Sequence, residues 1–391
     1  MKTRCKFSTF SMVIAYIFFV TFVIILPLIC GDWGYSWYFS SSWTENKMIE
    51  KASYVNIERL RSAQAYLSAR DPKESNEFHQ QNEILQDVDL AIGVVSVKRL
   101  HANYELGYLI QVMVQLERIF IADNAFNKKV MYLCNADAGP GEHVEASDLS
   151  RYFLYRKRFQ ENNPAESTLD PFEKEKKDYV FCLQNALKWN PDYILILEDD
   201  ALPRPNLFPV LKSILGRISH QSTKWSYLKL YHPERWQGYS FELNVIIELV
   251  VNGLIGACLV LFLSKCFCIA SFKRKRVMIF ISAFVYFMLL CLAIGRPYLL
   301  KWRHLHPSFH SLSKAPECCT PAMVYPKTAV HSLLSYLNKT KCSPYFPIDK
   351  ALAAFSRSHN LETYITEPNL VNHIGLFSTI KGGAKFPRDF V

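Results

Sequence analysis

The sequence predicts an α/β domain, a mainly parallel sheet flanked by helices, that is interrupted by membrane-spanning helices. Between residues 89 and 197, short apolar runs rich in β-branched residues alternate with segments of helical length, which is the pattern of a parallel sheet. Three longer apolar runs, 10–29, 243–263 and 277–295, approach the ~20 residues that cross a bilayer. Charged residues make up only 20% of the chain, below the ~25% of an ordinary soluble domain.

The first apolar run, 10–29, is expected to be an uncleaved membrane anchor. It contains no charged residue and follows the basic residues Lys2, Arg4 and Lys6. A cleaved signal peptide is the alternative, but its apolar core is usually only ~7–15 residues long. Because basic residues beside a span stay in the cytosol, the tail 1–9 is expected there.

The other two runs, 243–263 and 277–295, are expected to form a membrane hairpin. The short loop that joins them, 264–276, ends in four consecutive basic residues, and basic residues in short loops stay cytosolic. The long segments 31–242 and 296–391 then share the luminal side. We expect the first to hold a stem and the first part of one domain, and the second to hold its remainder.

The formal net charge of +10, from 45 Lys and Arg against 35 Asp and Glu, is explained by this topology. Most of the basic excess lies in the cytosolic tail and in the hairpin loop, where it acts as a topology signal. Nucleic-acid binding is therefore not expected. A disordered chain is also excluded, because 14% of the residues are aromatic.

The first luminal segment is expected to bring the ends of three strands together. After a helix over 45–70, the spacing of apolar residues predicts strand 89–97, helix 104–121, strand 129–134, helix 173–189 and strand 193–197. In such sheets, ligands bind beyond the carboxyl ends of the strands. The candidates at that edge are Lys98, Arg99, the loop 135–142 and the residues after Leu197.

Three consecutive acids, Glu198, Asp199 and Asp200, follow the last of these strands. Acids at the end of a buried strand repel one another unless a cation neutralises them. Hard oxygen ligands on a short turn suit Mn²⁺ or Mg²⁺, which proteins hold through one or two carboxylates together with phosphate oxygens. A solvated acidic turn before the next helix is the alternative. The position after a buried strand favours the metal site.

This arrangement resembles Golgi glycosyltransferases of the GT-A type, in which an acidic motif after a strand binds Mn²⁺ and the diphosphate of a sugar nucleotide. Further segments resemble the N-acetylglucosaminyltransferase IV group, namely 92–99, 177–181 with the following strand, Pro347–Asp349 and Asn372–Gly375. The first position of the acidic motif is Glu rather than Asp. The choice of metal-binding carboxylate therefore stays open.

The chain as a whole resembles a narrower family, the Golgi transferases that add N-acetylgalactosamine to GPI anchors. These have an N-terminal span and a GT-A domain interrupted by a tandem membrane hairpin, which is the layout expected here. The resemblance implies UDP-GalNAc as donor, a mannose of the GPI glycan at the luminal membrane surface as acceptor, and a Golgi membrane location. Direct displacement on the α-linked donor would invert the linkage to β.

The resemblance also implies roles for individual residues. Asp349 is the expected catalytic base, although Asp is also favoured as a helix cap. The expected metal ligands are Asp200, Asp199 and His373, with Asp200 favoured. The residues expected to contact the sugar nucleotide are Lys98, Arg99, Glu198, Asp199 and Lys381. For the basic residues a solvated surface position is the alternative, and for His373 a structural role in the core.

The cysteines in the luminal segments are Cys134, Cys182, Cys318, Cys319 and Cys342. A luminal compartment is oxidising, so disulfides are expected. The sequence does not give their pairing, and the odd number leaves at least one thiol free or paired elsewhere. Asn338 begins the sequence Asn-Lys-Thr, which is an acceptor for N-glycosylation.

Two other functions fit part of the sequence. An N-glycan-directed N-acetylglucosaminyltransferase would share the strand and metal motifs but lack the internal hairpin. A non-catalytic three-span membrane adaptor would not bring the acids at 198–200, Asp349 and His373 together in space, because only an enzyme needs a metal and a base to reach one substrate.

Overall fold

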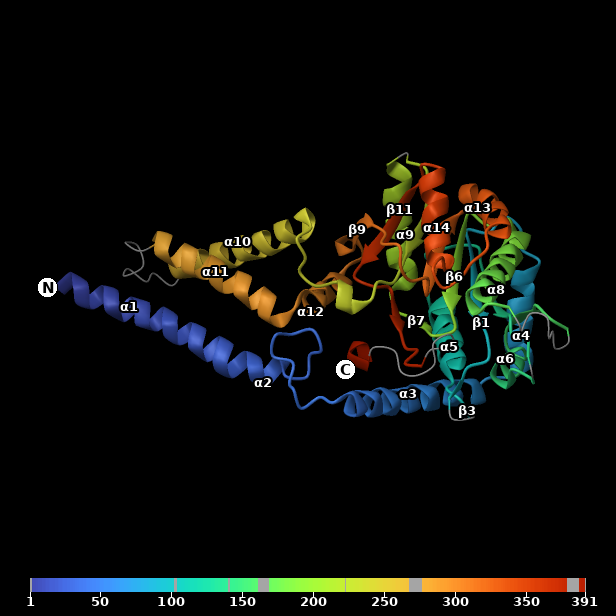
Figure 1. Cartoon of the computed structure of the whole chain (residues 1–391), viewed down its shortest axis with the longest axis horizontal. Coiled ribbons are helices and arrows are strands. Elements are labelled where there is room, and N and C mark those ends of the chain that lie inside the picture. The colour runs from blue at the N-terminus through green and yellow to red at the C-terminus, as the bar shows by residue number, and fades with distance from the viewer. Residues whose placement is uncertain are drawn as a thin grey trace. The chain divides into compact units, whose positions relative to one another are not determined.

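The computed structural model describes residues 2–101, 104–139, 141–160, 169–221, 223–266, 276–377 and 387–390. The chain divides into two units. The membrane unit consists of residues 1–50, 233–302 and 387–391, and the sheet unit of residues 51–232 and 303–386. The chain therefore leaves the sheet unit after residue 232 and returns to it at residue 303 to complete it (Figure 1).

The centre of the sheet unit is a sheet of eight strands in the described part of the chain. In spatial order these are β5 (Leu154–Lys157), β4 (Lys129–Asn135), β1 (Leu90–Ser96), β6 (Tyr193–Glu198), β10 (Ala322–Pro326), β8 (Trp225–Lys229), β11 (Glu362–Glu367) and β9 (Ser311–Lys314). The first four run parallel to one another. β10 lies antiparallel between β6 and β8, and β11 pairs parallel with β8 and antiparallel with β9. The predicted mainly parallel α/β sheet is confirmed, with antiparallel strands added by the second half of the chain.

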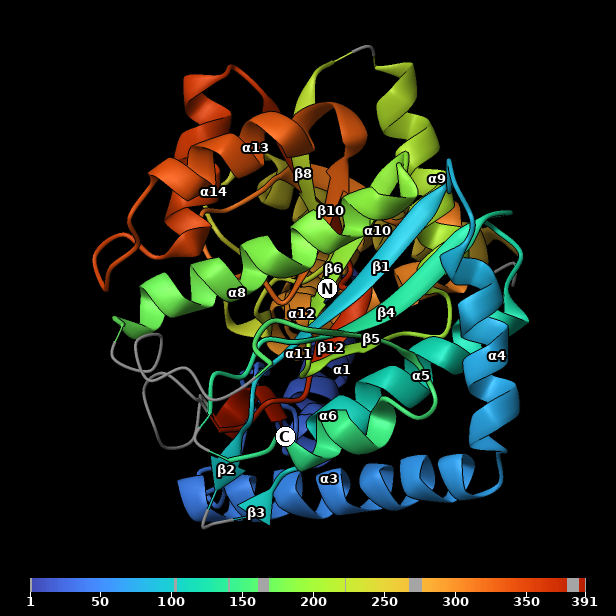
Figure 2. The same cartoon turned by 90° about the vertical axis from the view of Figure 1, so that its right-hand side faces the viewer.

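Helices cover both faces of this sheet (Figure 2). Alternate side chains of β1 point to opposite faces, so that Ile92 joins one hydrophobic core and Ala91 the other. The first core contains residues of α3 (Glu45–Ser68), α5 (Tyr108–Ala122), α6 (Val144–Leu149) and α9 (Leu207–His220). The second core contains residues of α8 (Pro171–Ala186), α13 (Lys327–Lys339) and α14 (Ile348–Ser358). Helix α4 (Pro72–Glu83) packs beside β4 and β5.

Two small antiparallel pairs stand outside the main sheet. β7 (Ala201–Pro203) pairs with β12 (Val371–His373), and β2 (Leu100–His101) pairs with β3 (Tyr104–Glu105). In the first pair His373 lies opposite Ala201, the residue that follows the three acids. A segment from the end of the chain is thereby held against the end of β6.

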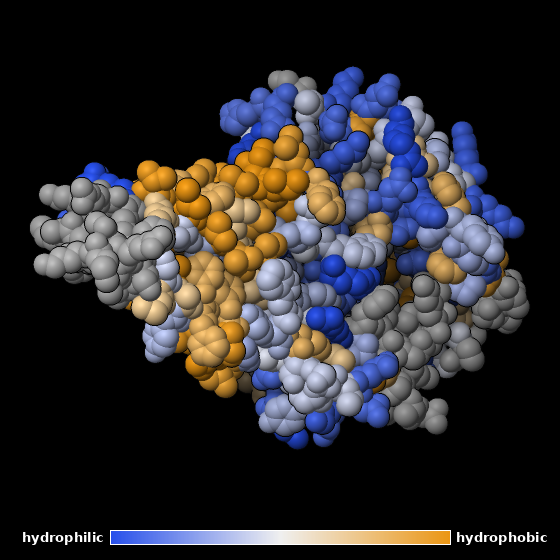
Figure 3. Space-filling view, turned by 60° about the vertical axis from the view of Figure 1, so that its left-hand side comes forward, coloured by the Kyte–Doolittle hydropathy of each residue, from blue (hydrophilic) through white to orange (hydrophobic). Residues whose placement is uncertain are grey.

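The membrane unit contains three helices that are long and apolar enough to cross a bilayer in the described part of the chain: Ser11–Cys30, Leu243–Cys266 and Arg276–Ile294. The first is formed by α1 (Lys2–Phe19), a π-helical turn (Val20–Ile25) and α2 (Leu26–Cys30), and the others are α10 and α11. Their apolar side chains form the orange surface in Figure 3. The protein is therefore a multi-pass membrane protein. Of the predicted basic loop, Lys273 to Lys275 lie outside the described residues.

Helices α10 and α11 pack closely because small residues lie between them. A Cβ atom added at Gly256 would lie 2.2 Å from the ring of Phe287, and small residues of this kind let membrane helices approach each other. Glu248, on α10, forms an ion pair with Arg296 of α12 (Arg296–Leu300), at 2.9 Å between Nη2 and Oε2. The apolar span thus carries a carboxylate with a defined cationic partner.

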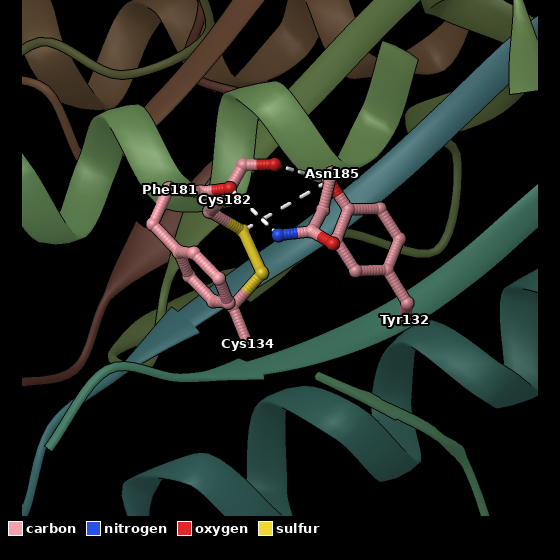
Figure 4. Close-up of a disulfide and its surroundings, with 5 residues drawn as sticks. All are labelled: Tyr132, Cys134, Phe181, Cys182 and Asn185. Atoms are coloured by element: carbon pink, nitrogen blue, oxygen red, sulfur yellow. Dashed lines mark hydrogen bonds between the residues drawn. A yellow bond between two sulfur atoms is a disulfide. The ribbon is translucent and has the colours of Figure 1, made fainter. Parts of the chain in front are cut away.

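One disulfide, Cys134–Cys182, joins β4 to α8 in the sheet unit (Figure 4). Both cysteines are fully buried. The Tyr132 hydroxyl donates a hydrogen bond to the Cys182 carbonyl at 2.8 Å, and the Asn185 amide donates to the Phe181 carbonyl at 2.9 Å. Cys318, Cys319 and Cys342 are free thiols in this structure. The bond fixes the helix to the strand next to β1.

Replacing both Cys134 and Cys182 by Ala is expected to destabilise the sheet unit. The bond closes a loop with a sequence separation of 48, and removing a native disulfide costs about 2–5 kcal/mol, in part because the unfolded chain becomes less constrained. The thermal unfolding midpoint of the detergent-solubilised protein measures the effect. Cys258→Ala, at an exposed position, is the control. An unchanged midpoint for the double variant would contradict the prediction.

Candidate active site at the carboxyl edge of the sheet

The carboxyl ends of the central strands meet at one edge of the sheet. In the register of the ladders, Ser96 of β1 lies opposite Asn135 of β4, and Val95 lies opposite Glu198 of β6. β10 runs antiparallel to β6 with Ala322 opposite Leu197, so that the segment before β10 reaches the same edge. β8 ends there as well, at Lys229. Residues far apart in the sequence are thus neighbours at the end of β6.

The three acids at the end of β6, the first of which is its last residue, make different contacts. The Glu198 carboxylate accepts a hydrogen bond from the Thr320 hydroxyl at 2.9 Å, and its backbone N–H donates to the Pro321 carbonyl. The Asp199 carboxylate accepts from the Ser96 hydroxyl at 3.1 Å and from the Val97 N–H at 3.4 Å. Glu198 is therefore held by the segment before β10, and Asp199 by the end of β1.

Asp200, which is fully buried, lies against the β7–β12 pair. The Oδ2 atom of Asp200 lies 3.3 Å from the Nε2 atom of His373. The backbone carbonyl of Asp200 accepts a hydrogen bond from the Ile374 N–H at 2.8 Å. A Cβ atom added at Gly375 would lie 1.9 Å from the same Oδ2 atom. The carboxylate occupies its position because residue 375 has no side chain.

Arg99, which the sequence suggested as a phosphate-binding residue, contacts two of the acids in this structure. Its Nη2 atom lies 2.5 Å from Asp199 Oδ1, and its Nη1 atom 2.7 Å from Asp200 Oδ2. Burial by itself would lower the pKa of Arg99, but the neighbouring carboxylates, Asp199 first, outweigh it and hold the pKa above its ordinary value. The guanidinium is therefore a permanent cation beside the acids.

Asp349 lies in the first turn of α14, which begins one residue earlier, at Ile348. The residue that precedes the helix is Pro347, so Asp349 does not occupy the cap position. Its carboxylate accepts hydrogen bonds from the N–H groups of Cys319, at 3.2 Å, and Lys350, at 2.8 Å. Because Thr320, the residue after Cys319, binds Glu198, the segment 317–321 joins Asp349 to the end of β6.

The remaining predicted residues are Lys98 and Lys381. Lys98 is half-buried at the end of β1, where its backbone N–H donates to Asp137 at 3.4 Å. Its ammonium lies 3.5 Å from the position of a Cβ atom on Gly141, within the loop 135–142. Lys381 lies outside the described residues.

Several residues at this edge were not found from the sequence. Lys229 is 1% exposed and donates from its ammonium to the Cys318 carbonyl, and burial lowers its pKa. His143 holds the Ser96 hydroxyl at 2.8 Å, and the ring of Tyr231 lies 5.6 Å from that of His373. Lys229 lies opposite Met323 of β10, two strands away from β1, and the sequence carries no signal for this position because it depends on the strand order.

The predicted metal ligands are two carboxylates and an imidazole, side chains of the types that bind divalent metals. In the described part of the chain, no group of three or more His, Cys, Asp and Glu side chains is arranged to hold a metal. The side chains of Asp200 and His373 nevertheless lie 3.3 Å apart. A divalent ion in a nucleotide site needs only one or two protein ligands when phosphate oxygens and water complete its shell. The residues fit such an ion in type.

The chain matches a protein family described as GPI-N-acetylgalactosamine transferase PGAP4 over residues 90–372. The matched range begins at the first residue of β1 and ends within β12, so that it includes the acids, Asp349 and the membrane hairpin. It favours the GPI-directed function over the N-glycan-directed transferase and the membrane adaptor. Because the range covers more than half of the 391 residues, the chain belongs to this family and is a UDP-sugar-dependent glycosyltransferase that transfers N-acetylgalactosamine to the GPI glycan.

Proposed function

We propose that this enzyme transfers N-acetylgalactosamine from UDP-GalNAc to a mannose of the GPI glycan by a metal-dependent, inverting displacement. One observation carries the proposal. The Asp200 carboxylate and the His373 imidazole, 173 positions apart, lie 3.3 Å from each other at the carboxyl edge of the sheet, where α/β proteins bind their ligands.

Asp200 and His373 are the proposed ligands of Mn²⁺ or Mg²⁺, with Asp199 as a further carboxylate beside them. When bound, such an ion stabilises the negative charge that develops on the departing diphosphate. The protein contributes the fixed position of Asp200, which the small residue at Gly375 permits. Its burial raises the strength of every charge interaction at the site.

Asp349 is the proposed catalytic base. Its carboxylate is partly exposed and is fixed by the backbone N–H of Cys319. It would accept the proton of the mannose hydroxyl while that oxygen bonds to the anomeric carbon and the bond from this carbon to the diphosphate breaks. Attack from the face opposite the leaving group converts an α-linked donor into a β-linked product.

The sugar nucleotide is proposed to contact Glu198, Asp199 and the cationic residues Lys98, Arg99 and Lys381. Lys98 and Arg99 lie just after the end of β1, Arg99 against the acids and Lys98 with its ammonium near Gly141. Charge-assisted hydrogen bonds from such groups to phosphate are about twice as strong as neutral ones, so that they would hold the diphosphate at the strand ends.

The sheet unit is proposed to lie in the lumen of the Golgi, with the N-terminus in the cytosol. The buried disulfide Cys134–Cys182 supports an oxidising compartment, and the basic residues of the tail and the hairpin loop support the orientation. The hairpin lies between β8 and β9 in the sequence. Because its two helices span the membrane, it would hold the enzyme at the surface that carries the lipid-linked acceptor.

Replacing Asp200 by Asn is expected to lower transferase activity by about 100-fold or more, because a divalent ion contributes several kcal/mol of charge stabilisation. A chelator should lower wild-type activity to a similar level, and added Mn²⁺ should restore it. Product formation from UDP-GalNAc by the purified protein is the measurement. Asp148→Asn, at an exposed carboxylate of α6, is the matched control. Turnover that withstands both chelator and the Asp200 change would overturn the metal assignment.

Gly375→Ala is expected to lower activity by about 100-fold, because the new methyl group collides with Asp200 and small displacements of an active-site group cost about that factor. Gly216→Ala is the matched control. Nothing lies within 4 Å of a Cβ atom at Gly216, on α9, where the same change should preserve activity and raise stability by up to about 1 kcal/mol. Equal activity of the two variants would show that Gly375 does not position Asp200.

Replacing residues 243–295 by a soluble linker is expected to impair action on membrane-bound GPI more than action on a freed glycan. Confinement near the acceptor raises its effective concentration, and only the membrane-bound substrate profits from it. The ratio of the two activities, measured with the same preparation, is the readout. An equal loss on both substrates would argue against the tethering role.

A further inference from the structure

Arg99 neutralises both aspartates of the acidic motif. The side chains of Asp199 and Asp200 are 4% and 0% exposed, and that of Arg99 is 13% exposed. Two adjacent carboxylates with so little access to water require a cation. The described residues supply it through the two terminal nitrogens of this guanidinium.

The guanidinium binds the same Asp200 oxygen that lies beside His373. Asp200 Oδ2 lies 2.7 Å from Arg99 Nη1 and 3.3 Å from His373 Nε2. A divalent ion bound between Asp200 and His373 would lie about 2.0–2.6 Å from its oxygen ligands. An ion at that distance and a guanidinium on the same oxygen repel each other strongly in a buried site. Asp200 Oδ2 therefore serves one of the two cations at a time.

Asp199 has partners that do not depend on Arg99. Its Oδ2 atom accepts hydrogen bonds from the Ser96 hydroxyl and from the Val97 N–H, and His143 holds the Ser96 hydroxyl in turn. If the guanidinium turned away, Asp199 would remain fixed to the end of β1. Asp200 is therefore the acid at which the divalent ion would replace the guanidinium of Arg99.

The guanidinium also has an unused donor. The Nε atom of Arg99 is buried and has no hydrogen-bond acceptor among the described residues. A buried donor without a partner costs free energy, and an anionic ligand with several oxygens would satisfy it. Arg is well suited to such a ligand, because its planar fork matches phosphate.

We propose that Arg99 is an exchangeable cation, which neutralises Asp199 and Asp200 in the free enzyme and yields Asp200 to the divalent metal when the donor enters, its guanidinium then binding the diphosphate. This inference rests on the proposed function, in which the metal binds at Asp200 and His373. Its consequence is ordered binding. The metal alone must displace Arg99 from a buried carboxylate, whereas in the presence of UDP the guanidinium has another anion to bind. Metal and UDP should therefore strengthen each other's binding by the same factor.

The test measures Mn²⁺ binding to the full-length protein in detergent, from the electron paramagnetic resonance signal of free Mn²⁺, with and without UDP. In the wild type, UDP should tighten Mn²⁺ binding by about tenfold or more, within the usual range of coupling between sites. In Arg99→Gln, Mn²⁺ without UDP should bind about tenfold tighter than in the wild type, and UDP should add little. Arg99→Lys, which keeps the charge but loses the fork, should lie between the two.

Arg151→Gln is the control, because it also removes one positive charge, at a side chain that is 65% exposed and pairs with Asp148 rather than with Asp199 or Asp200. Its Mn²⁺ affinity, with and without UDP, should change by less than about twofold, since salt screens the charge of an exposed side chain. Thermal unfolding of each variant checks that it is folded. If Arg99→Gln does not fold, the comparison of Arg99→Lys with the wild type is the test.

The outcomes separate the two proposals. If the wild type binds no Mn²⁺ even with UDP, the proposed metal dependence fails and the exchange fails with it. If the wild type binds Mn²⁺ but the two Arg99 variants match it in affinity and in the effect of UDP, the metal site stands and the exchange is wrong. Tight Mn²⁺ binding to the wild type that UDP does not alter would also overturn the exchange.

Discussion

The burial of acidic groups at the end of β6 is the constraint on which the rest of this site depends. Three consecutive carboxylates stand at the end of a strand that is covered on both faces, and charges in such a place must be paired and hydrogen-bonded to be tolerated. The fold meets this requirement by bringing in partners from the end of β1, from the segment before β10 and from β12. Each of the three carboxylates thereby has a different partner: Thr320 for Glu198, Ser96 for Asp199 and His373 for Asp200.

The strand order explains how the domain tolerates a membrane hairpin inside its sequence. β8, before the hairpin, and β10 and β11, after it, are neighbours in the sheet, so that the second half of the chain completes the sheet begun by the first. Thr320, Asp349 and His373 all come from this second half. Thr320 binds Glu198 and His373 lies beside Asp200, whereas Asp349 binds Cys319, the residue before Thr320. The site is incomplete without both halves, which ties its formation to the folding of the whole sheet unit.

The sequence was sufficient for the local parts of this arrangement. The strands that became β1, β4 and β6 and the position of the acids follow from short apolar runs, because burial on both faces leaves a clear pattern. Parts that depend on strand order could not be predicted. Lys229 is an ordinary lysine in the sequence, and only the pairing of β8 with β10 carries it to the candidate site. Nor does the sequence tell that Arg99 binds two aspartates, since salt-bridge geometry depends on how the chain turns after β1.

The segment 317–321 connects the two sides of the proposed reaction. Its backbone N–H at Cys319 fixes Asp349, the hydroxyl of Thr320 fixes Glu198, and Lys229 donates to the carbonyl of Cys318. The segment therefore contacts both the proposed base and Glu198, the first acid of the motif, and a shift of this segment would displace both. Such coupling has a chemical use, since a base must meet the acceptor hydroxyl at the moment when the donor is aligned, and misplacement by about 1 Å can cost two orders of magnitude in rate. The buried ammonium of Lys229 donates to the backbone of this segment and helps to fix the segment in one position. Attraction to the carboxylates of Asp349 and Glu317 stabilises the buried charge of Lys229.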